Sequence, residues 1–197
     1  MGYSLNPISD NCYPGTTVLI NRFDIREQGK LDEVESVLTA SRIAEWLESP
    51  GKSSFDFAHY REIHRFIFAD LYDWAGKIRT VNISKKGTVF CPASGIEEQG
   101  NRIFGRLAEN NFLLDLPKEE FVKEFVELYC TTNYLHPFRE GNGRTQRVFL
   151  SQLAEHAGYV LDFSKIDTDL LMMATIQSAN GVTDLLSELM IEAVHKI

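Results

Sequence analysis

The most informative stretch of this chain reads His136-Pro137-Phe138-Arg139-Glu140-Gly141-Asn142-Gly143-Arg144-Thr145-Gln146-Arg147. Pro137 disfavours the α-helical conformation for His136, and the two glycines that flank Asn142 add backbone freedom. After Gly143, apolar residues recur at helical spacing, which predicts a turn that opens a helix. Free amide N–H groups and the positive end of the helix dipole make such a helix start an anion site.

Charged side chains in the same stretch indicate phosphate chemistry. Arg144 and Arg147 share one face of the helix start, where they repel each other and oppose the dipole. A bound polyphosphate makes this arrangement favourable, since arginine forms forked contacts with phosphate oxygens. Glu140 would repel a bare polyphosphate, but Mg²⁺ takes one or two carboxylates together with phosphate oxygens. His136 could remove the proton of an incoming hydroxyl, so the residues predict Mg²⁺-assisted nucleotidyl or phosphoryl transfer.

The stretch resembles the signature of Fic-domain proteins, His-Pro-Phe-x-(Asp/Glu)-Gly-Asn-Gly-Arg-x-x-Arg, at every fixed position. Most proteins of that family are adenylyltransferases, which move AMP from ATP to a Ser, Thr or Tyr hydroxyl of another protein. The resemblance implies that Phe138 anchors the loop in the core, and it implies these roles: His136 as general base, Glu140 as Mg²⁺ ligand, and Gly141, Asn142, Gly143, Arg144 and Arg147 as nucleotide-binding residues. A related branch that transfers phosphate has Gly-Asn-Lys-Arg, whereas this chain has Gly143, so AMP transfer is favoured.

Length and composition predict one domain over residues 1–197. The chain is 197 residues long and 44% hydrophobic, which is enough for a full core. We expect a Fic core at about 31–160, a flap at 78–91 and C-terminal helices at 161–197. The formal charge of −8 argues against binding nucleic acid, whereas three arginines and one glutamate give the central stretch a charge of +2. A positive pocket in an acidic body suits a small anionic substrate such as ATP.

The sequence indicates a cytoplasmic protein that does not associate with membranes. Its three cysteines, Cys12, Cys91 and Cys130, show no metal-ligand spacing and are typical of reduced thiols. The N-terminus lacks the pattern of an export signal, and no apolar run approaches the ~20 residues of a spanning helix. Delivery into a host cell by a specialised secretion system would leave no such pattern.

Apolar spacing predicts an all-α fold, which the resemblance describes as the Fic fold, a helical bundle with a β-hairpin flap beside the active-site loop. We expect helices at about 31–49, 56–73, 96–114, 117–135, 143–158 and 184–194. Another should begin at a capping box formed by Ser164 and Asp167, with Met172 and Met173 as core residues. His59 and His64 are interpreted as residues of a polar face or core edge, without a ligand role.

The only strand pair that we predict turns at Lys85-Lys86-Gly87. An isolated hairpin has unpaired edges, so an extended segment of a target protein could add itself as another strand. In the Fic family this hairpin, the flap, serves that purpose. The expected target-docking residues are Val81, Asn82, Ile83, Ser84, Thr88, Val89 and Phe90.

Many Fic proteins carry an inhibitory helix with the pattern (Ser/Thr)-x-x-x-Glu-(Gly/Asn), whose glutamate pairs with the second arginine of the motif, here Arg147. Ser and Glu have this spacing at 41 and 45, 94 and 98, and 151 and 155, but Trp46, Gln99 and His156 follow, so the pattern is never completed. The resemblance therefore favours the toxin-like bacterial subclass, in which a small antitoxin protein supplies the inhibitory helix in trans.

Two alternatives stay open. The chain could transfer another phosphate-linked group, such as UMP or phosphocholine, because the motif does not determine which nucleotide base is bound. It could be a nucleotide-binding regulatory module that has lost catalysis, although every catalytic position is filled. The target, and a role as toxin or as injected effector, do not follow from the motif.

Overall fold

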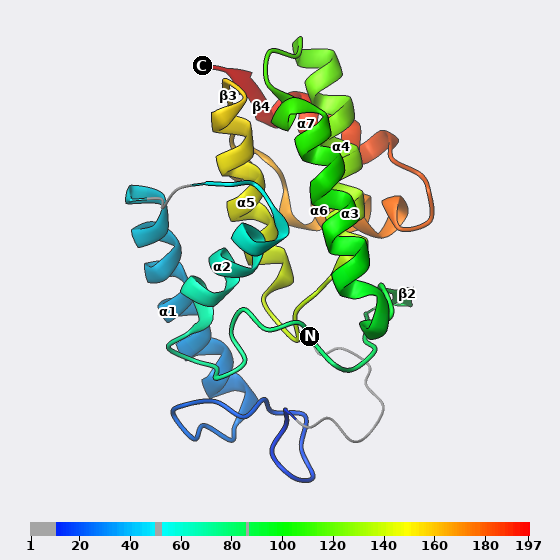
Figure 1. The fold of residues 1–197 in the computed structure, drawn as a ribbon. Coiled ribbons are helices and arrows are strands. Elements are labelled where there is room, and N and C mark those ends of the chain that lie inside the picture. The colour runs from blue at the N-terminus through cyan, green and yellow to red at the C-terminus, as the bar shows by residue number, and fades with distance from the viewer. Residues whose placement is uncertain (1–10, 50–52, 86) are drawn as a thin grey trace.

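The computed structural model describes residues 11–49, 53–85 and 87–197. In this part, the α-helices are α1 (Gln28–Glu48), α2 (Phe57–Phe68), α3 (Ile96–Glu109), α4 (Lys118–Leu135), α5 (Asn142–His156), α6 (Thr168–Ser178) and α7 (Asp184–Ala193) (Figure 1). Short 3₁₀ helices are η1 (Ala93–Gly95), η2 (Asn111–Leu113) and η3 (Phe163–Lys165). Two antiparallel pairs join β1 (Ser84–Lys85) to β2 (Thr88–Val89) and β3 (Tyr159–Leu161) to β4 (Val194–Lys196). The predicted helical domain with a β-hairpin is confirmed.

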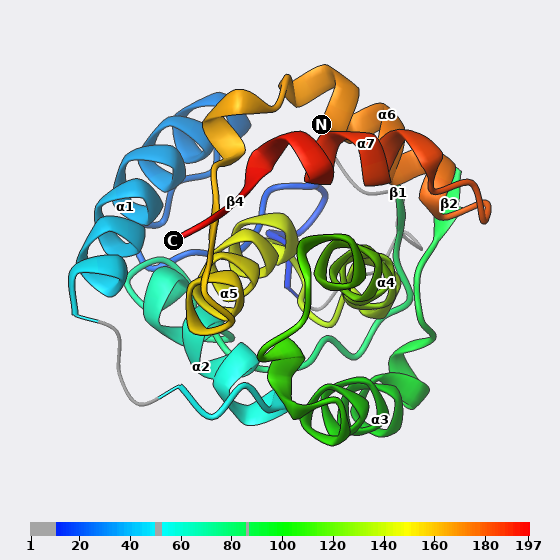
Figure 2. The same ribbon diagram turned by 90° about the horizontal axis from the view of Figure 1, so that it is seen from above.

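Helix α5 lies at the centre of the bundle. Seen nearly along their axes, α4 and α5 stand side by side, and α1, α2, α3, α6 and α7 surround them (Figure 2). The apolar side chains of α5 include Phe149, Leu150 and Leu153, all fully buried. A helix that is buried on most of its faces holds its first turn rigidly. The loop from α4 into α5 is therefore fixed at both ends by the core.

Local sequence explains where the elements that flank this loop begin and end. Pro117 precedes α4 and cannot extend a helix backwards, because it has no N–H to donate. Helix α4 ends at Leu135, and the next residue, His136, has a left-handed backbone with φ 40°. Gly141 has φ 80° immediately before α5, a conformation that glycine adopts without steric cost. The loop thus turns sharply at both of its ends.

Two predicted helices end earlier than expected. Helix α2 stops at Phe68 rather than near residue 73, because the chain then turns to bury Leu71 and Tyr72. Helix α3 stops at Glu109 rather than near residue 114. The next turn, η2, has positive φ at all three of its residues, which a right-handed helix cannot contain.

Three predictions for the C-terminal third are wrong. The cap of α6 is Asp167, whose carboxylate accepts bonds from the N–H groups of Asp169 and Leu170, whereas Ser164 lies in η3. Met173 is 50% exposed rather than in the core, because only part of the apolar surface of α6 is covered. The pair β3–β4 was not predicted, since its strands are three residues each and lie far apart in sequence.

No helix in the described residues is both long enough and apolar enough to cross a membrane.

Candidate active site

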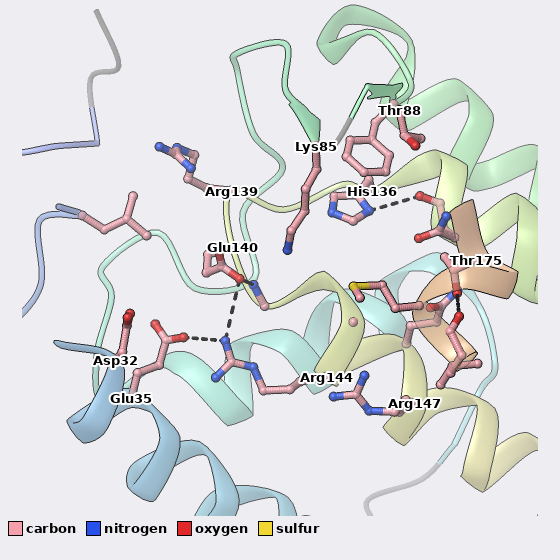
Figure 3. Close-up of a pocket in the computed structure, with 18 of the residues that line it drawn as sticks. Asp32, Glu35, Lys85, Thr88, His136, Arg139, Glu140, Arg144, Arg147 and Thr175 are labelled. Carbon is pink, nitrogen blue, oxygen red and sulfur yellow. Dashed lines mark hydrogen bonds and ion pairs between the residues drawn. The ribbon is translucent and has the colours of Figure 1, made fainter. Parts of the chain in front are cut away.

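A cavity of about 740 Å³ opens beside the start of α5, with walls from α1, the β1–β2 hairpin, the α4–α5 loop and α6 (Figure 3). The predicted site residues that line it are His136, Glu140, Gly141, Gly143, Arg144, Arg147, Thr88 and Phe90. The structure therefore brings the predicted base, the predicted metal ligand and both arginines into one pocket.

His136 is held as a neutral imidazole. Its Nδ1 lies 3.1 Å from the backbone oxygen of Asn133, which assigns the ring proton to Nδ1 and the lone pair to Nε2. The ring stacks on Phe90 with centroids 3.6 Å apart. Burial, with a smaller effect from the charges of Arg79 and Lys85, lowers the pKa of His136 to about 3. A neutral imidazole with a lone pair at Nε2 can accept a proton across the physiological pH range.

The side chain of Asn142 closes the loop on itself. Its Oδ1 accepts a bond from the Phe138 N–H at 2.9 Å, and its Nδ2 donates to the Phe138 carbonyl at 2.8 Å. Phe138 is fully buried, so the expected anchoring role of its ring is confirmed. The Asn142 amide thus braces the loop instead of lining the cavity, and its backbone N–H belongs to the first turn of α5.

Glycine is required at position 141 by conformation and by space. Its φ of 80° lies in the left-handed region, and a Cβ there would meet the Phe68 ring at 2.2 Å. At Gly143 a Cβ would only touch the guanidinium end of Arg147, at 3.4 Å. The backbone of Gly141 therefore packs directly on the core, whereas Gly143 faces the open cavity.

His64, on α2, supports the α4–α5 loop from the side that faces α2. The Gly76 N–H donates to its Nδ1 at 2.8 Å, so Nε2 carries the proton and donates to the Glu140 carbonyl at 3.0 Å. The ring also stacks on Phe138 with centroids 3.8 Å apart. Burial lowers the pKa of His64 to about 3, and the charge of Arg144 adds to the decrease. The expectation of a polar-face or core-edge residue was wrong, since His64 is fully buried.

The Glu140 side chain lines the cavity at the start of α5. Its Oε1 accepts a bond from the Gly141 N–H at 2.8 Å and lies 3.8 Å from an Arg144 nitrogen. In the described part of the chain, no group of three or more His, Cys, Asp or Glu side chains is arranged to hold a metal. A single carboxylate nevertheless fits Mg²⁺, which takes its other ligands from phosphate and water.

The two arginines of the motif have different surroundings. Arg144 is paired with Glu35 of α1 and lies over the Phe68 ring. Arg147 points into the cavity and forms no ion pair within the described residues (Figure 3). Although Arg147 is exposed to the cavity, the surrounding walls lower the pKa of its guanidinium through desolvation. Arg147 is thus the arginine available to an anion.

The hairpin is tied to the loop by Arg79, a residue that sequence reasoning missed. Its three guanidinium nitrogens donate to the carbonyls of His136, Val81 and Cys91, at 2.8, 2.7 and 2.6 Å. These bonds connect both ends of the hairpin to the backbone of His136. Nothing in the sequence distinguishes Arg79 from a surface arginine.

The predicted flap residues divide into two sets. Thr88 and Phe90 line the cavity, and Val89 is 73% exposed beside it. Ile83 is buried, and the Asn82 side chain accepts a bond from the Ala93 N–H. Ser84 pairs with Val89 in the hairpin, whose strands are two residues each and shorter than expected.

Other residues of the cavity were also missed. Helix α6 contributes Thr168, Leu171, Met172, Thr175 and Ile176. Helix α1 and the turn after α2 contribute Asp32, Glu35 and Tyr72. The local sequence of α6 shows an apolar helix but not what it covers, because that depends on long-range packing.

Comparison with known proteins agrees with this geometry. The family model described as Fic/DOC family matches residues 54–154. A protein of Sinorhizobium fredii named probable protein adenylyltransferase y4lH is 44% identical over 171 residues, covering 86% of this chain and 88% of the relative. The probable protein adenylyltransferase Fic of Escherichia coli K12 is 39% identical over 169 residues, covering 86% and 84%.

A solved structure has the same fold and holds a nucleotide. The BepC protein of Bartonella tribocorum, a VirB-translocated effector with bound AMPPNP, superposes with a TM-score of 0.89 at 26% identity. The match covers 95% of this chain and 97% of that one. The identity with the curated relatives and the family match together show that this chain belongs to the Fic/DOC family.

Proposed function

We propose that this protein is a protein adenylyltransferase that transfers AMP from ATP to a Ser, Thr or Tyr hydroxyl of a target protein. The observation that carries the proposal is that a neutral histidine and the start of a buried helix face one cavity. The relatives named as adenylyltransferases support the reaction, and the AMPPNP-bound structure of BepC supports nucleotide binding.

The chain's own residues can perform each step. Nε2 of His136 accepts the proton of the target hydroxyl, and the resulting oxygen attacks the α-phosphorus of ATP. The new bond forms as the bond from the α-phosphorus to the bridging oxygen breaks, and pyrophosphate leaves. The N–H groups at the start of α5 and the guanidinium of Arg147 stabilise the negative charge on the phosphates.

Glu140 is the residue that would hold Mg²⁺. Its carboxylate lies in the cavity next to the start of α5, which suits an ion shared between one carboxylate and phosphate oxygens. Such an ion neutralises charge on the phosphates during transfer.

The exposed side of the hairpin is the proposed docking site for the target. Val89 is exposed, and Thr88 and Phe90 lie at the cavity, so a segment added along β2 would pass close to His136. Backbone bonds give such an added strand its affinity, and neighbouring side chains give it specificity. A target hydroxyl on that segment could reach Nε2.

We also propose control by a separate antitoxin in a bacterial toxin system. Within the described residues Arg147 has no acidic partner, so a glutamate from another chain could occupy it and compete with the outer phosphates. The chain would then be active when purified alone. Addition of a candidate antitoxin should stop labelling, and a variant antitoxin without its glutamate should not.

The sparse and odd set of three cysteines supports a reducing location, so we place the protein in the cytoplasm of a bacterium. Translocation of a relative such as BepC makes delivery into a host cell the alternative role.

Labelled nucleotides separate AMP transfer from its alternatives. Purified protein with Mg²⁺ and a cell lysate should label protein from ATP that carries the label at the α-phosphate. Label that arrives only from the γ-phosphate would establish phosphate transfer instead. Stronger labelling from UTP or a phosphocholine donor would replace AMP by that group. Tight ATP binding without transfer to any protein would favour a regulatory module.

A further inference from the structure

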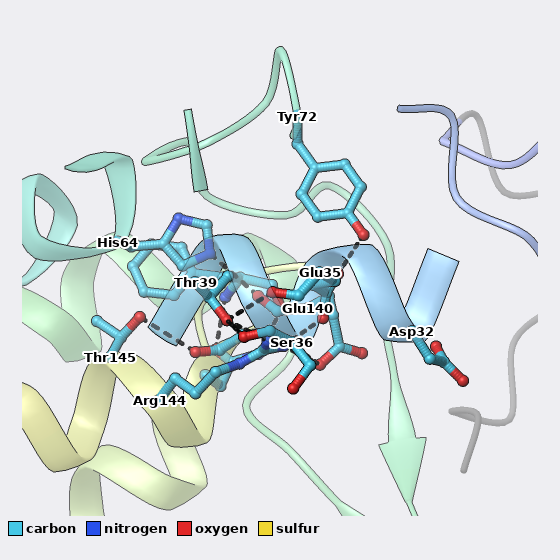
Figure 4. Close-up of polar contacts among 12 residues, drawn as sticks. Asp32, Glu35, Ser36, Thr39, His64, Tyr72, Glu140, Arg144 and Thr145 are labelled. Carbon is cyan, nitrogen blue, oxygen red and sulfur yellow. Dashed lines mark hydrogen bonds and ion pairs between the residues drawn. The ribbon is translucent and has the colours of Figure 1, made fainter. Parts of the chain in front are cut away.

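Arg144 is held on the α1 side of the cavity by a set of contacts that the motif does not contain. One terminal nitrogen donates to Oε1 of Glu35, and the other donates to the Thr39 hydroxyl at 3.1 Å (Figure 4). The guanidinium lies over the Phe68 ring, 4.8 Å from its centroid. Arg144 is therefore fixed on several sides.

Glu35 is itself held in place. Its second carboxylate oxygen accepts a bond from the Tyr72 hydroxyl, so both oxygens have a partner. Burial and the charge of Glu35 raise the pKa of Tyr72, which keeps that hydroxyl protonated as a donor. The Glu35 side chain is only 13% exposed, and an ion pair shielded from water in this way is screened less by salt than one on the surface.

The contact between Arg144 and Glu140 is loose by comparison. The two residues are four apart across the start of α5, which is the spacing at which Glu and Arg side chains pair on a helix. Their nearest nitrogen and oxygen nevertheless lie 3.8 Å apart, since Glu35 holds the same nitrogen more closely. Without Glu35, Arg144 would be drawn to Glu140.

The charge of Glu35 affects how well a cation can bind at Glu140. With Glu35 present, the three side chains Glu35, Arg144 and Glu140 carry a net charge of one negative unit, which attracts a cation. Without the Glu35 carboxylate, Arg144 and Glu140 would neutralise each other, and a cation would have to displace the arginine. Groups that orient a metal ligand without touching the metal often change metal affinity by roughly 10- to 100-fold.

We propose that Glu35 is a positioning residue: together with Tyr72 and Thr39 it holds Arg144 away from Glu140, so that the Glu140 carboxylate stays available to a divalent cation. This inference rests on the proposed function of Glu140. Arg147, rather than Arg144, would then make most of the contacts with the outer phosphates.

Nucleotide binding tests the inference without catalysis. The affinity for ADP is measured by calorimetry in EDTA and in Mg²⁺, and the ratio of the two dissociation constants reports the coupling between metal and nucleotide. Glu35→Gln should reduce this ratio by roughly tenfold or more while affinity in EDTA stays within a few fold. Glu33→Gln removes a carboxylate from the exposed side of α1, and it should keep the wild-type ratio.

A double variant distinguishes positioning from simple damage. In Glu35→Gln/Arg144→Gln no arginine is left to neutralise Glu140, so the coupling ratio should recover towards the wild-type value. A ratio equal to or lower than that of Glu35→Gln would overturn the inference, because removal of the arginine would then not restore the coupling. Circular dichroism melting of each variant checks that it is folded.

Other outcomes are equally decisive. An unchanged ratio in Glu35→Gln would overturn the positioning role of Glu35. Tighter ADP binding in EDTA by more than tenfold would show instead that Glu35 blocks Arg144 from the phosphates. Absence of Mg²⁺ coupling in the wild-type protein would overturn both the metal site and this inference. Failure of AMP transfer alone would overturn the proposed reaction and leave the coupling result valid.

Discussion

Nε2 of His64 donates a hydrogen bond to the backbone carbonyl of Glu140 over 3.0 Å, and this bond links the core to the loop that carries the site. The motif contains every residue proposed to touch the nucleotide phosphates, but residues outside the motif also help to hold the loop in shape. His64 below and Arg79 beside the loop are two such supports.

Substitution of His64 should impair the site as well as the fold. His64→Ala leaves a cavity and an unpaired carbonyl, and we expect a loss of about 2 to 4 kcal/mol in the free energy of unfolding. ADP binding should weaken because the loop is no longer held. His59 is a buried histidine of the same helix whose ring packs against Trp46, Phe55 and Phe149, so His59→Ala should lower stability but keep ADP affinity. Equal ADP binding by both variants would contradict the supporting role.

Substitution of Phe90 should change the pH dependence of transfer. Phe90 covers the His136 ring, and Phe90→Ala exposes that ring to water, so the pKa of His136 should rise towards its usual value of about 6.5. The wild-type rate should stay level between about pH 5 and about pH 7. The rate of the variant should fall as the pH decreases through about 6.5. A wild-type rate that already falls near this pH would contradict the depressed pKa.

Gly141 should be the least replaceable glycine of the loop. Gly141→Ala places a methyl group 2.2 Å from Phe68 in a left-handed conformation, so the free energy of unfolding should fall by about 2 to 4 kcal/mol. Gly29→Ala in α1 has open space around its Cβ and should leave stability unchanged or raise it by up to about 1 kcal/mol. Urea unfolding measures both. Similar effects of the two changes would contradict the close packing described for Gly141.

Acid should destabilise the folded protein before its carboxylates titrate. Burial lowers the pKa of both His64 and His136 to about 3, whereas in the unfolded chain they titrate near ~6.5. Below that pH the unfolded state binds more protons, so stability decreases as pH falls, by up to about 1.4 kcal/mol per pH unit for each histidine. The free energy of unfolding between pH 7 and pH 5 should show this slope, and His64→Gln should reduce it. A free energy of unfolding that stays constant over this pH range in the wild-type protein would contradict the burial of His64 and His136 as neutral imidazoles.

The sequence located the residues that line the cavity better than the residues that support them. His136, Glu140, Gly141 and the two arginines were predicted because their chemistry is local to one loop, and all of them line the cavity. The supporting residues come from other elements, and only folding brings them near. Glu35 lies 109 residues from Arg144 in sequence, and no local pattern relates the two.

The same distinction holds for the fold. Apolar spacing located the long helices, since their burial follows their own periodicity. It did not locate β3 and β4, whose pairing joins Tyr159 to Lys196. It also placed Met173 in the core, because periodicity cannot show which side of an apolar helix a neighbour covers.

The most direct test is transfer from ATP labelled at the α-phosphate, with wild-type protein and with His136→Ala. The variant removes the base but no phosphate contact, so we predict that it binds ADP within a few fold of wild type. Label should reach protein with the wild type and fall by a factor of roughly 100 or more with the variant. Undiminished labelling by His136→Ala, or absence of α-label with the wild-type protein, would contradict the account.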